Sequence, residues 1–524
     1  MGELRHNLLR VIANFGRFGA NLVFGLLLVR LLLQFGGEVY SVVILLGTTI
    51  GYFRLFPDVV QQSIIHELVS AYHREEEPEA LVSVFAAAIR VGLITAGVMV
   101  LGIVLFVALL HAVFDIPPAL HGAARFMALC IGLQTVAVAL SAPSFNMLNV
   151  WERFAEVNTW MVAQRVTFPS AALAVTFMDL SGEADRIVAY GFLSTLLFLG
   201  VLLAAVIRVH RREPRLRLFH PEYETAVVKR MLLLGGWNTA ANVALMVQTV
   251  FSSVLMNRFF GLTANGMFGL ALQLGNYVRI IAHGMAGGLD TISARFGVAH
   301  GDEGIRKLLY YAGLAHTWAV MSVFPLLMLY PQQILQLWIG PAEANPEIDY
   351  GLTANLIRLF AFGAMFTGIA DGWIKLLIGA GRAAGYARAL LLITGFGIPA
   401  SLLLALFGPE WLRFYSLSFP YTLFYPCLGL PAFVYVLARW SGSRPAQILA
   451  PLARVLGPVS CGVAGLFAVR ALALPAPWGF LLAVAAHLGL YALSSWFLLV
   501  DAGLRGRIQK RVLARFTSGT DQAG

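Results

Sequence analysis

Residues 235–296 read GGWNTAANVALMVQTVFSSVLMNRFFGLTANGMFGLALQLGNYVRIIAHGMAGGLDTISARF, two long apolar segments that meet at a short Gly/Thr/Asn turn. The second segment carries Arg279, His283 and Asp290. At about 100° per residue, offsets of four and eleven positions return to nearly the same side of a helix. A cation, an imidazole and a carboxylate are therefore predicted to line one stripe of a helix that is otherwise suited to lipid.

The same layout occurs 225 positions earlier, where residues 35–54 read FGGEVYSVVILLGTTIGYFR. They align with residues 260–279, FGLTANGMFGLALQLGNYVR. This repeat predicts two copies of one bundle with the same topology, related by a pseudo-two-fold axis along the membrane normal. The identical positions are Phe35 and Phe260, Gly36 and Gly261, Tyr52 and Tyr277, and Arg54 and Arg279.

The composition is that of a membrane protein. Of the 524 residues, 59% are hydrophobic and 12% are charged, whereas a soluble domain carries about 25% charged residues. The apolar N-terminal run is read as a first span rather than a signal peptide, because it is too long and Arg17 interrupts it. Cys130, Cys427 and Cys461 lie in apolar runs without the spacing of a metal site or a disulfide framework.

Apolar segments of about 20 residues predict an all-α polytopic protein with about fourteen transmembrane helices. Pro57, Pro169 and Pro420 are candidate kinks. The predicted spans are 9–33, 41–66, 81–111, 121–148, 155–178, 187–208, 229–257, 266–291, 305–330, 352–380, 385–407, 413–437, 447–471 and 477–501.

Arginine and lysine are unevenly distributed among the connectors. The connector at 208–228 and the C-terminal tail are rich in both, whereas residues 340–351, GPAEANPEIDYG, have neither. By the positive-inside rule both termini are predicted to be cytoplasmic. The predicted parts are a six-helix lobe (1–222), a second six-helix lobe (223–440), two additional helices (441–504) and a basic cytoplasmic tail (505–524).

The connectors are short, and none of the nucleotide-binding, zinc-protease or serine-hydrolase motifs is present in its required context. The sequence therefore predicts neither an enzyme nor a nucleic-acid-binding protein, and it predicts no metal or organic cofactor. The basic clusters flank predicted spans and are interpreted as topology signals, with contact to lipid phosphates as a second interpretation.

Six cations lie well inside predicted spans, each costing about 2.5–3.5 kcal/mol at a helix centre. They are Arg17, Arg54, Arg90, Arg165, Arg279 and Lys375. An internal polar cavity between the first two helices of each copy would avoid this cost. The predicted substrate-binding residues are Arg17, Asn21, Arg54, Arg165, Asn242, Asn276, Arg279, His283 and Lys375.

Structural interpretations stay open for several of these residues. Arg54 with Asp58, and Asp371 with Lys375, have the spacing of i,i+4 ion pairs. His283 has the alternative of a bond to a backbone carbonyl. Arg17 and Arg279 have no acid three or four residues away, which favours ligand contact for both.

Arginine forks suit phosphate, and cations outnumber acids within the predicted spans, so the cavity is predicted to take an anionic cargo. Antiport of Na⁺ or H⁺ would need an oxygen-rich or titratable site. The candidates for that site are Asp290 and Asp371, with His283 as a further titratable group.

Three segments resemble the polysaccharide-transport branch (Wzx-like, lipid-linked oligosaccharide flippases) of the multidrug/oligosaccharidyl-lipid/polysaccharide exporter superfamily. They are LVRLLLQFGGEVYSVVILL at 28–46, SVLMNRFFGLTANGMFGLALQL at 253–274 and PQQILQLWIG at 331–340. The resemblance implies two six-helix lobes around a central cationic cavity, with alternating access. The implied cargo is an undecaprenyl-diphosphate-linked oligosaccharide, moved from the cytoplasmic to the outer leaflet of the bacterial inner membrane.

The resemblance also implies roles for particular residues. Arg17, Arg54 and Arg279 occupy places comparable to cavity arginines of the peptidoglycan branch, and residues 447–501 would form a groove for the lipid tail. That branch has a second arginine shortly after the first, which this chain lacks. An exopolysaccharide or O-antigen-like unit is therefore favoured. The implied partners are the lipid-linked sugar, membrane lipid and a polysaccharide polymerase, with the transporter as a monomer.

Other function classes stay open at this point. One is a cation-coupled drug or metabolite exporter of the same superfamily, and another is a flippase for a peptidoglycan precursor. A third is a glycan polymerase or ligase. Such an enzyme usually carries its catalytic groups on a sizeable external loop, whereas the connector at 340–351 is short and offers only Glu343, Glu347 and Asp349.

Overall fold

The structure is a computed structural model in which every described element is helical. For some helical stretches, among them residues 2–15, 55–60 and 294–302, only the backbone is described. The described chain covers residues 2–506 apart from 52–54, 73–77, 217–222, 235, 286–288, 381, 476, 502 and 504.

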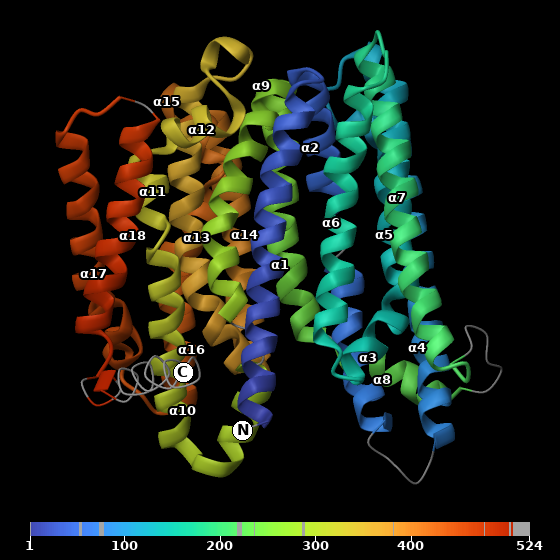
Figure 1. Cartoon of the computed structure of the whole chain (residues 1–524). Coiled ribbons are helices and arrows are strands. Elements are labelled where there is room, and N and C mark those ends of the chain that lie inside the picture. The colour runs from blue at the N-terminus through green and yellow to red at the C-terminus, as the bar shows by residue number, and fades with distance from the viewer. Residues whose placement is uncertain are drawn as a thin grey trace, which may run out of the picture.

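The helices run nearly parallel to one another along most of the chain (Figure 1). Their bounds are α1 Gly2–Leu33, α2 Gly37–Gly51, α3 Leu55–Tyr72, α4 Pro78–Val113, α5 His121–Val150, α6 Phe154–Thr176, α7 Glu183–Arg212, α8 Thr225–Leu234, α9 Gly236–Met285, α10 Leu289–Met321, α11 Phe324–Leu329, α12 Pro331–Ile339, α13 Tyr350–Gly379, α14 Ala383–Phe407, α15 Glu410–Ser416, the π-helix η4 Pro420–Gly429, α16 Leu430–Ser441, α17 Pro445–Ala471 and α18 Trp478–Leu498, with short 3₁₀ turns η2 Pro118–Leu120 and η3 Ala342–Ala344.

These helices confirm an all-α polytopic membrane protein. Among the described residues, 11 helices are long and apolar enough to cross a membrane, and α2 is a shorter apolar helix. The predicted number of spans, about fourteen, is larger than these 11 for three reasons. α9 contains two predicted spans in one helix, the second predicted span is divided between α2 and α3, and α6 is absent from the 11. Large apolar side chains such as Leu101 and Leu392 are exposed, whereas Asn146 and Asn257 are buried, as expected for a bundle in lipid.

The bend in α9 is at Gly261, where φ is 86° and the backbone leaves helical geometry. Its repeat partner Gly36 joins α1 to α2 and has a φ of 127°. Only glycine adopts such angles without steric cost, so a glycine with positive φ interrupts helical geometry at the aligned position of both copies. The sequence repeat therefore has a structural counterpart at the turn itself.

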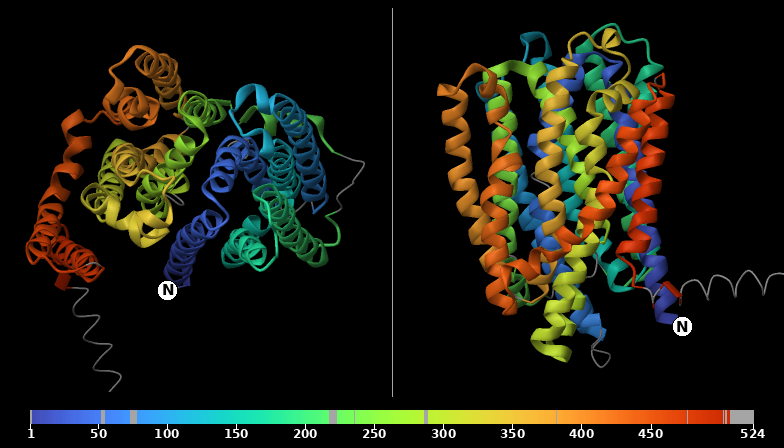
Figure 2. Two further views of the ribbon diagram at one scale, coloured as in Figure 1. Left: turned by 90° about the horizontal axis from the view of Figure 1, so that it is seen from above. Right: turned by 90° about the vertical axis from the view of Figure 1, so that its left-hand side faces the viewer.

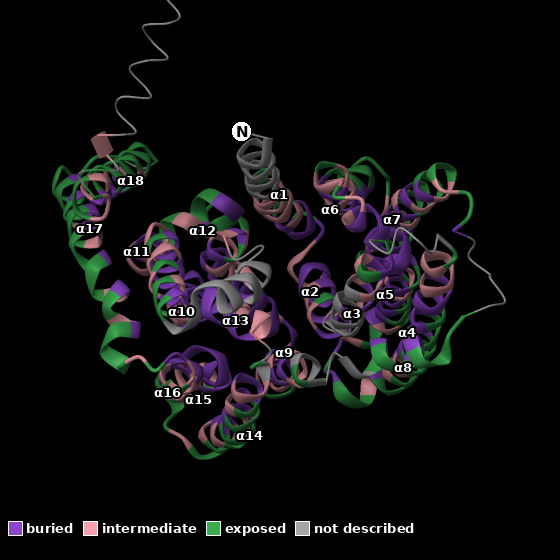
Figure 3. Cartoon of the chain, turned by 90° about the horizontal axis from the view of Figure 1, so that it is seen from below, coloured by how far each residue is buried: buried purple, intermediate pink, exposed green. Residues whose placement is uncertain are grey.

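The helices form two groups when the molecule is viewed along its long axis (Figures 2 and 3). We call α1–α7 the first bundle and α9–α16 the second bundle; α17 and α18 lie outside the second bundle. Helix α8 packs against the first bundle, since Val227, Val228 and Met231 belong to a core cluster with residues of α3 and α4. The boundary predicted at 222/223 stays a prediction, and this packing favours a division after α8.

Hydrogen bonds between described residues of the two bundles lie toward the bend of α9. Asn257 accepts a hydrogen bond from the backbone N–H of Asp115 at 2.7 Å and donates one to its carbonyl at 3.1 Å. Trp338 Nε1 donates to the carbonyl of Leu26 at 2.8 Å, and Gln273 Nε2 donates to that of Gly25 at 3.2 Å. Polar side chains therefore join the bundles at this end, which Figure 1 places opposite the start of α1.

Gly275 allows α9 and α13 to approach closely, because a Cβ there would lie 2.5 Å from Phe360 Cβ and 2.9 Å from its carbonyl carbon. We expect Gly275→Ala to lower the free energy of unfolding by about 1–3 kcal/mol, since the backbone of Phe360 must shift. Thermal unfolding of the purified chain in detergent measures the effect. Gly97→Ala is the control, as its Cβ would meet nothing within 4 Å. Equal unfolding temperatures for both variants would contradict this account.

Candidate functional site

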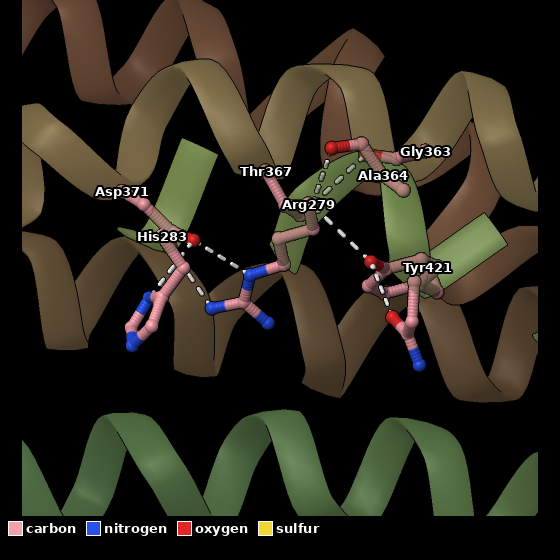
Figure 4. A network of polar contacts seen from close by, with 8 residues as sticks. Arg279, His283, Gly363, Ala364, Thr367, Asp371 and Tyr421 are labelled. Carbon is pink, nitrogen blue, oxygen red and sulfur yellow. Dashed lines mark hydrogen bonds and ion pairs between the residues drawn. The ribbon is translucent and has the colours of Figure 1, made fainter. Parts of the chain in front are cut away.

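An ion pair inside the second bundle joins α9 to α13. Arg279 donates from Nε to Asp371 Oδ2 at 2.8 Å and from Nη2 to Oδ1 at 2.9 Å (Figure 4). His283, one turn further along α9, places Nδ1 3.5 Å from the same Oδ2. The side chain of Asp371 is 6% exposed, that of Arg279 30% and that of His283 49%. A buried carboxylate thus holds a guanidinium in the bidentate geometry that arginine also offers to phosphate.

Small residues make this pairing sterically feasible. A Cβ on Gly368 would lie 3.4 Å from the Cα of Arg279 and 2.8 Å from Val320. A Cβ on Gly363 would lie 2.7 Å from the carbonyl oxygen of Tyr421. Such close helix packing through glycine is typical of membrane bundles. The approach of α9, α13 and η4 therefore brings Arg279 within reach of a carboxylate 92 positions away in the sequence.

Polar side chains of α9, α13, η4 and α10 lie near the ion pair. Tyr421 of η4 donates its hydroxyl to Asn276 Oδ1 at 3.5 Å and lies 3.2 Å from the hydroxyl of Thr367. Figure 4 shows Tyr421 and Asp371 on opposite sides of Arg279. On α10, His316 is buried and its Nδ1 bonds the carbonyl of Ala312 at 2.8 Å. Asn276, predicted as a substrate-binding residue, is thus part of a structural network around Arg279.

A chain of contacts connects this ion pair to the first bundle. The ring of His283 meets the ring of Phe18 edge to face, with centroids 6.4 Å apart. The guanidinium carbon of Arg17 lies 4.8 Å from the centroid of the same Phe18 ring. Arg17 and Arg279 therefore stand on either side of a short aromatic bridge that crosses the interface between the bundles.

Among the described residues, a cavity of about 240 Å³ lies in the first bundle, and a cavity of about 580 Å³ is lined by residues of the first bundle together with Gln273 of α9. Arg17 lines the smaller one and Arg165 the larger one, and both cavities share Val138 and Met161. Arg17 Nη1 lies 2.9 Å from the sulfur of Met161, and no carboxylate among the described side chains pairs with it. Arg279 lines neither cavity. Arg17 and Arg279 therefore do not line one common cavity of these two. They approach each other across the interface of the bundles, through Phe18 and His283.

The remaining predicted residues are distributed over the site and its surroundings. Asn21 has a buried Oδ1 without a partner among the described residues. Asn242 is half-buried in α9, and Lys375 is half-buried one turn after Asp371 in α13. Arg54 and the side chains of Asp58 and Asp290 lie outside the described residues.

The i,i+4 pairing considered for Asp371 and Lys375 is not the one that the described residues show. Asp371 pairs with Arg279 and His283 instead. Asp371 was predicted as a coupling-ion candidate and Arg279 as a substrate ligand, and the structure joins the two in one ion pair. No local sequence signal predicts this contact, or the one between Phe18 and His283. Within the described residues, no group of three or more His, Cys, Asp or Glu side chains could hold a metal ion.

No protein-family model and no curated protein matches the sequence. Solved structures do match the fold. An inward-facing multidrug resistance MATE family transporter of the MOP superfamily has a TM-score of 0.66 and 13% identity, covering 84% of this chain and 98% of its own. The lipid II flippase MurJ, inward closed, has a TM-score of 0.63 and 12% identity, covering 94% and 98%. The chain has the fold of MOP-superfamily transporters.

A third match is the MATE multidrug transporter DinF-BH in a ligand complex, with a TM-score of 0.61 and 16% identity over 85% of this chain and 96% of its own. These neighbours are described as transporters and a flippase. At such identities the likeness shows the fold and leaves the cargo open.

Proposed function

We propose that this chain is a flippase for a lipid-linked oligosaccharide, with an undecaprenyl diphosphate carrier and an exopolysaccharide or O-antigen-like unit. The observation that carries the proposal is the placement of Arg17 and Arg279 on either side of Phe18 and His283, across the interface of the two bundles. Arg279 is paired with Asp371, whereas Arg17 has no carboxylate partner among the described side chains, so a diphosphate held there would neutralise the Arg17 charge, which lipid cannot. Alternating access of the two bundles would then carry the head group across the membrane.

The charge of the side chains at the site favours an anionic cargo over a cationic drug. A cationic drug would require an unpaired carboxylate, and Asp371, the acid of this site whose side chain is described, is engaged by Arg279 and His283. The coverage of the chain also favours a flippase, since MurJ matches 94% of it and the drug exporters match 84–85%. A peptidoglycan-precursor flippase is the second candidate, supported by that coverage.

An apolar cavity suits the lipid tail. It has a volume of about 490 Å³ and lies between α1, α9, α11, α12 and α18. Leu26, Leu274, Trp338 and Phe480 are among its lining residues, with Arg30 as its one charged residue. We propose that the prenyl chain contacts this surface and the neighbouring helices α17 and α18 while the head group crosses.

The proposal includes a location and an orientation. Because of the arginine-rich connectors, we propose by the positive-inside rule that both termini lie on the cytoplasmic side of the bacterial inner membrane. Asp371, Asp290 and His283 are proposed to serve any coupling to Na⁺ or H⁺. A monomer acting together with a polysaccharide polymerase is the proposed working form.

Transport in liposomes tests the proposal. The purified chain is reconstituted with prenyl-diphosphate-linked N-acetylglucosamine, and sugar that reaches the outer leaflet is labelled by an added galactosyltransferase. We expect labelling to proceed well past the half that is accessible at the start. Liposomes without the protein are the control. Labelling that stops at half, together with uptake of a cationic rhodamine dye by the same liposomes, would favour a drug exporter instead.

Asn257 is expected to hold the bundles together at the α9-bend end. Replacing Asn257 by alanine removes both hydrogen bonds to Asp115, so opening at this end should increase about tenfold. Ser41, buried against Gly266 of the other bundle, reports this opening as Ser41→Cys through labelling by a membrane-impermeant maleimide. Asn355→Ala is the control, because Asn355 bonds only within the second bundle in the described structure. Unchanged labelling in Asn257→Ala would show that other contacts hold the bundles closed.

A further inference from the structure

We propose that the smaller cavity of the first bundle, the amide cavity, binds the sugar adjoining the diphosphate of the cargo. The inference rests on the proposed function and names the part of the cargo that this cavity recognises. The amide cavity is lined by Arg17, Gln61, Asn149 and Gln164, together with apolar residues of α5, α6 and α7. Four helices, α1, α3, α5 and α6, therefore each contribute a polar side chain to the lining of one cavity.

The three carboxamides of this cavity have no hydrogen-bond partner among the described residues. Gln164 is only 6% exposed, yet its side chain makes no hydrogen bond to the described residues, and neither do those of Gln61 and Asn149. Buried polar groups in native proteins are almost always hydrogen-bonded, and leaving one unpaired is costly. Gln164 is the buried one of the three, whereas Gln61 and Asn149 are half-buried, and a ligand in this cavity would supply the partners that the described residues do not.

The chemistry of a carboxamide selects the kind of ligand. Each amide offers donors and an acceptor, so it is fully satisfied only by a group that both donates and accepts. A phosphate supplies acceptors alone, and a prenyl tail supplies neither. Sugar hydroxyls supply both, and Phe145, Val157 and Leu202 offer apolar surface to the carbon–hydrogen faces of a sugar ring.

The larger cavity provides an internal comparison. Its buried carboxamide, Gln134, already donates from Nε2 to Thr195 at 2.9 Å and lies 3.5 Å from the hydroxyl of Ser194. The carboxamide of Gln134 in the larger cavity thus has protein partners, whereas that of Gln164 in the amide cavity has none among the described residues. Arg17 lies in the same cavity, and a diphosphate bound to it would place the first sugar directly beside Gln164 and Asn149.

The cavity's size agrees with this assignment. At about 240 Å³ it is smaller than the usual small-molecule site of about 300–1,000 Å³, which fits a ligand as small as a single sugar. The adjoining cavity of about 580 Å³ leaves room for the next sugars of the unit. Contact with sugar hydroxyls is thus expected to be strongest for the first sugar.

Binding of matched probes to the purified full-length chain tests the inference. The probes are geranylgeranyl diphosphate and the same lipid carrying glucose, galactose or N-acetylglucosamine. We expect at least one sugar-bearing probe to bind more tightly than the bare diphosphate. Gln164→Leu and Asn149→Leu should each reduce that advantage about tenfold while leaving binding of the bare diphosphate unchanged. Gln248→Leu, a buried glutamine of the second bundle bonded to Thr394, is the control and should keep the advantage.

The outcomes separate this inference from the function on which it rests. If the wild-type chain binds none of the four probes, the proposed function itself fails. If it binds all four equally, or if the two variants retain the sugar advantage, the diphosphate site stands and the amide cavity holds water only. Equal loss of bare and sugar-bearing probes in the variants would also overturn the inference, since the amides would then support the diphosphate or the fold.

Discussion

Replacing Arg279 by alanine is expected to lower the free energy of unfolding by about 3–5 kcal/mol, because the carboxylate of Asp371 would stay buried without its guanidinium partner. His283 lies 3.5 Å away and is half-exposed, so it compensates only in part. Thermal unfolding of the purified chain measures the loss of stability, and export of the lipid-linked sugar should be lost as well.

The double variant Arg279→Ala with Asp371→Ala separates the two effects. Removing both charges leaves no buried ion, so we expect most of the stability to return while transport stays absent. Recovery of transport in the double variant would show that Arg279 serves only to neutralise Asp371. A stability loss in Arg279→Ala below about 1 kcal/mol would mean that water reaches the carboxylate freely.

Replacing Arg17 by alanine is expected to abolish transport with little effect on stability, unlike replacement of Arg279. No carboxylate among the described side chains pairs with Arg17, so its removal leaves no buried counter-charge and the free energy of unfolding should change by less than about 1 kcal/mol. Transport of a prenyl-diphosphate-linked sugar should fall about 100-fold or more, since a charge-assisted, bidentate phosphate contact is lost. The liposome assay and thermal unfolding measure the two quantities on the same preparation.

Two matched variants complete that test. Arg17→Lys keeps the charge without the planar fork and should recover transport only in part. Arg454→Ala removes an arginine of α17 that contacts Tyr310 at the exposed surface, and transport should be unaffected. Full transport by Arg17→Ala would remove this residue from the substrate path and with it the main support for an anionic cargo.

The sequence by itself determined the helical class, most span positions and the turn shared by the two copies. Helix hydrogen bonds are local, and the length of an apolar run sets whether it can cross lipid, so both can be read from consecutive residues. The aligned glycines Gly36 and Gly261 were predictive for the same reason, since a positive φ is a property of one residue and its neighbours.

Only the tertiary structure decided which polar groups meet. Asp371 reaches Arg279 from 92 positions away because glycines on α13 let the helices approach, and Phe18 reaches His283 across the bundle interface. The amides of the proposed sugar site come from different helices and show no common period along the chain. Such contacts depend on the crossing of packed helices, a property of side-chain shapes in three dimensions that no stretch of sequence contains.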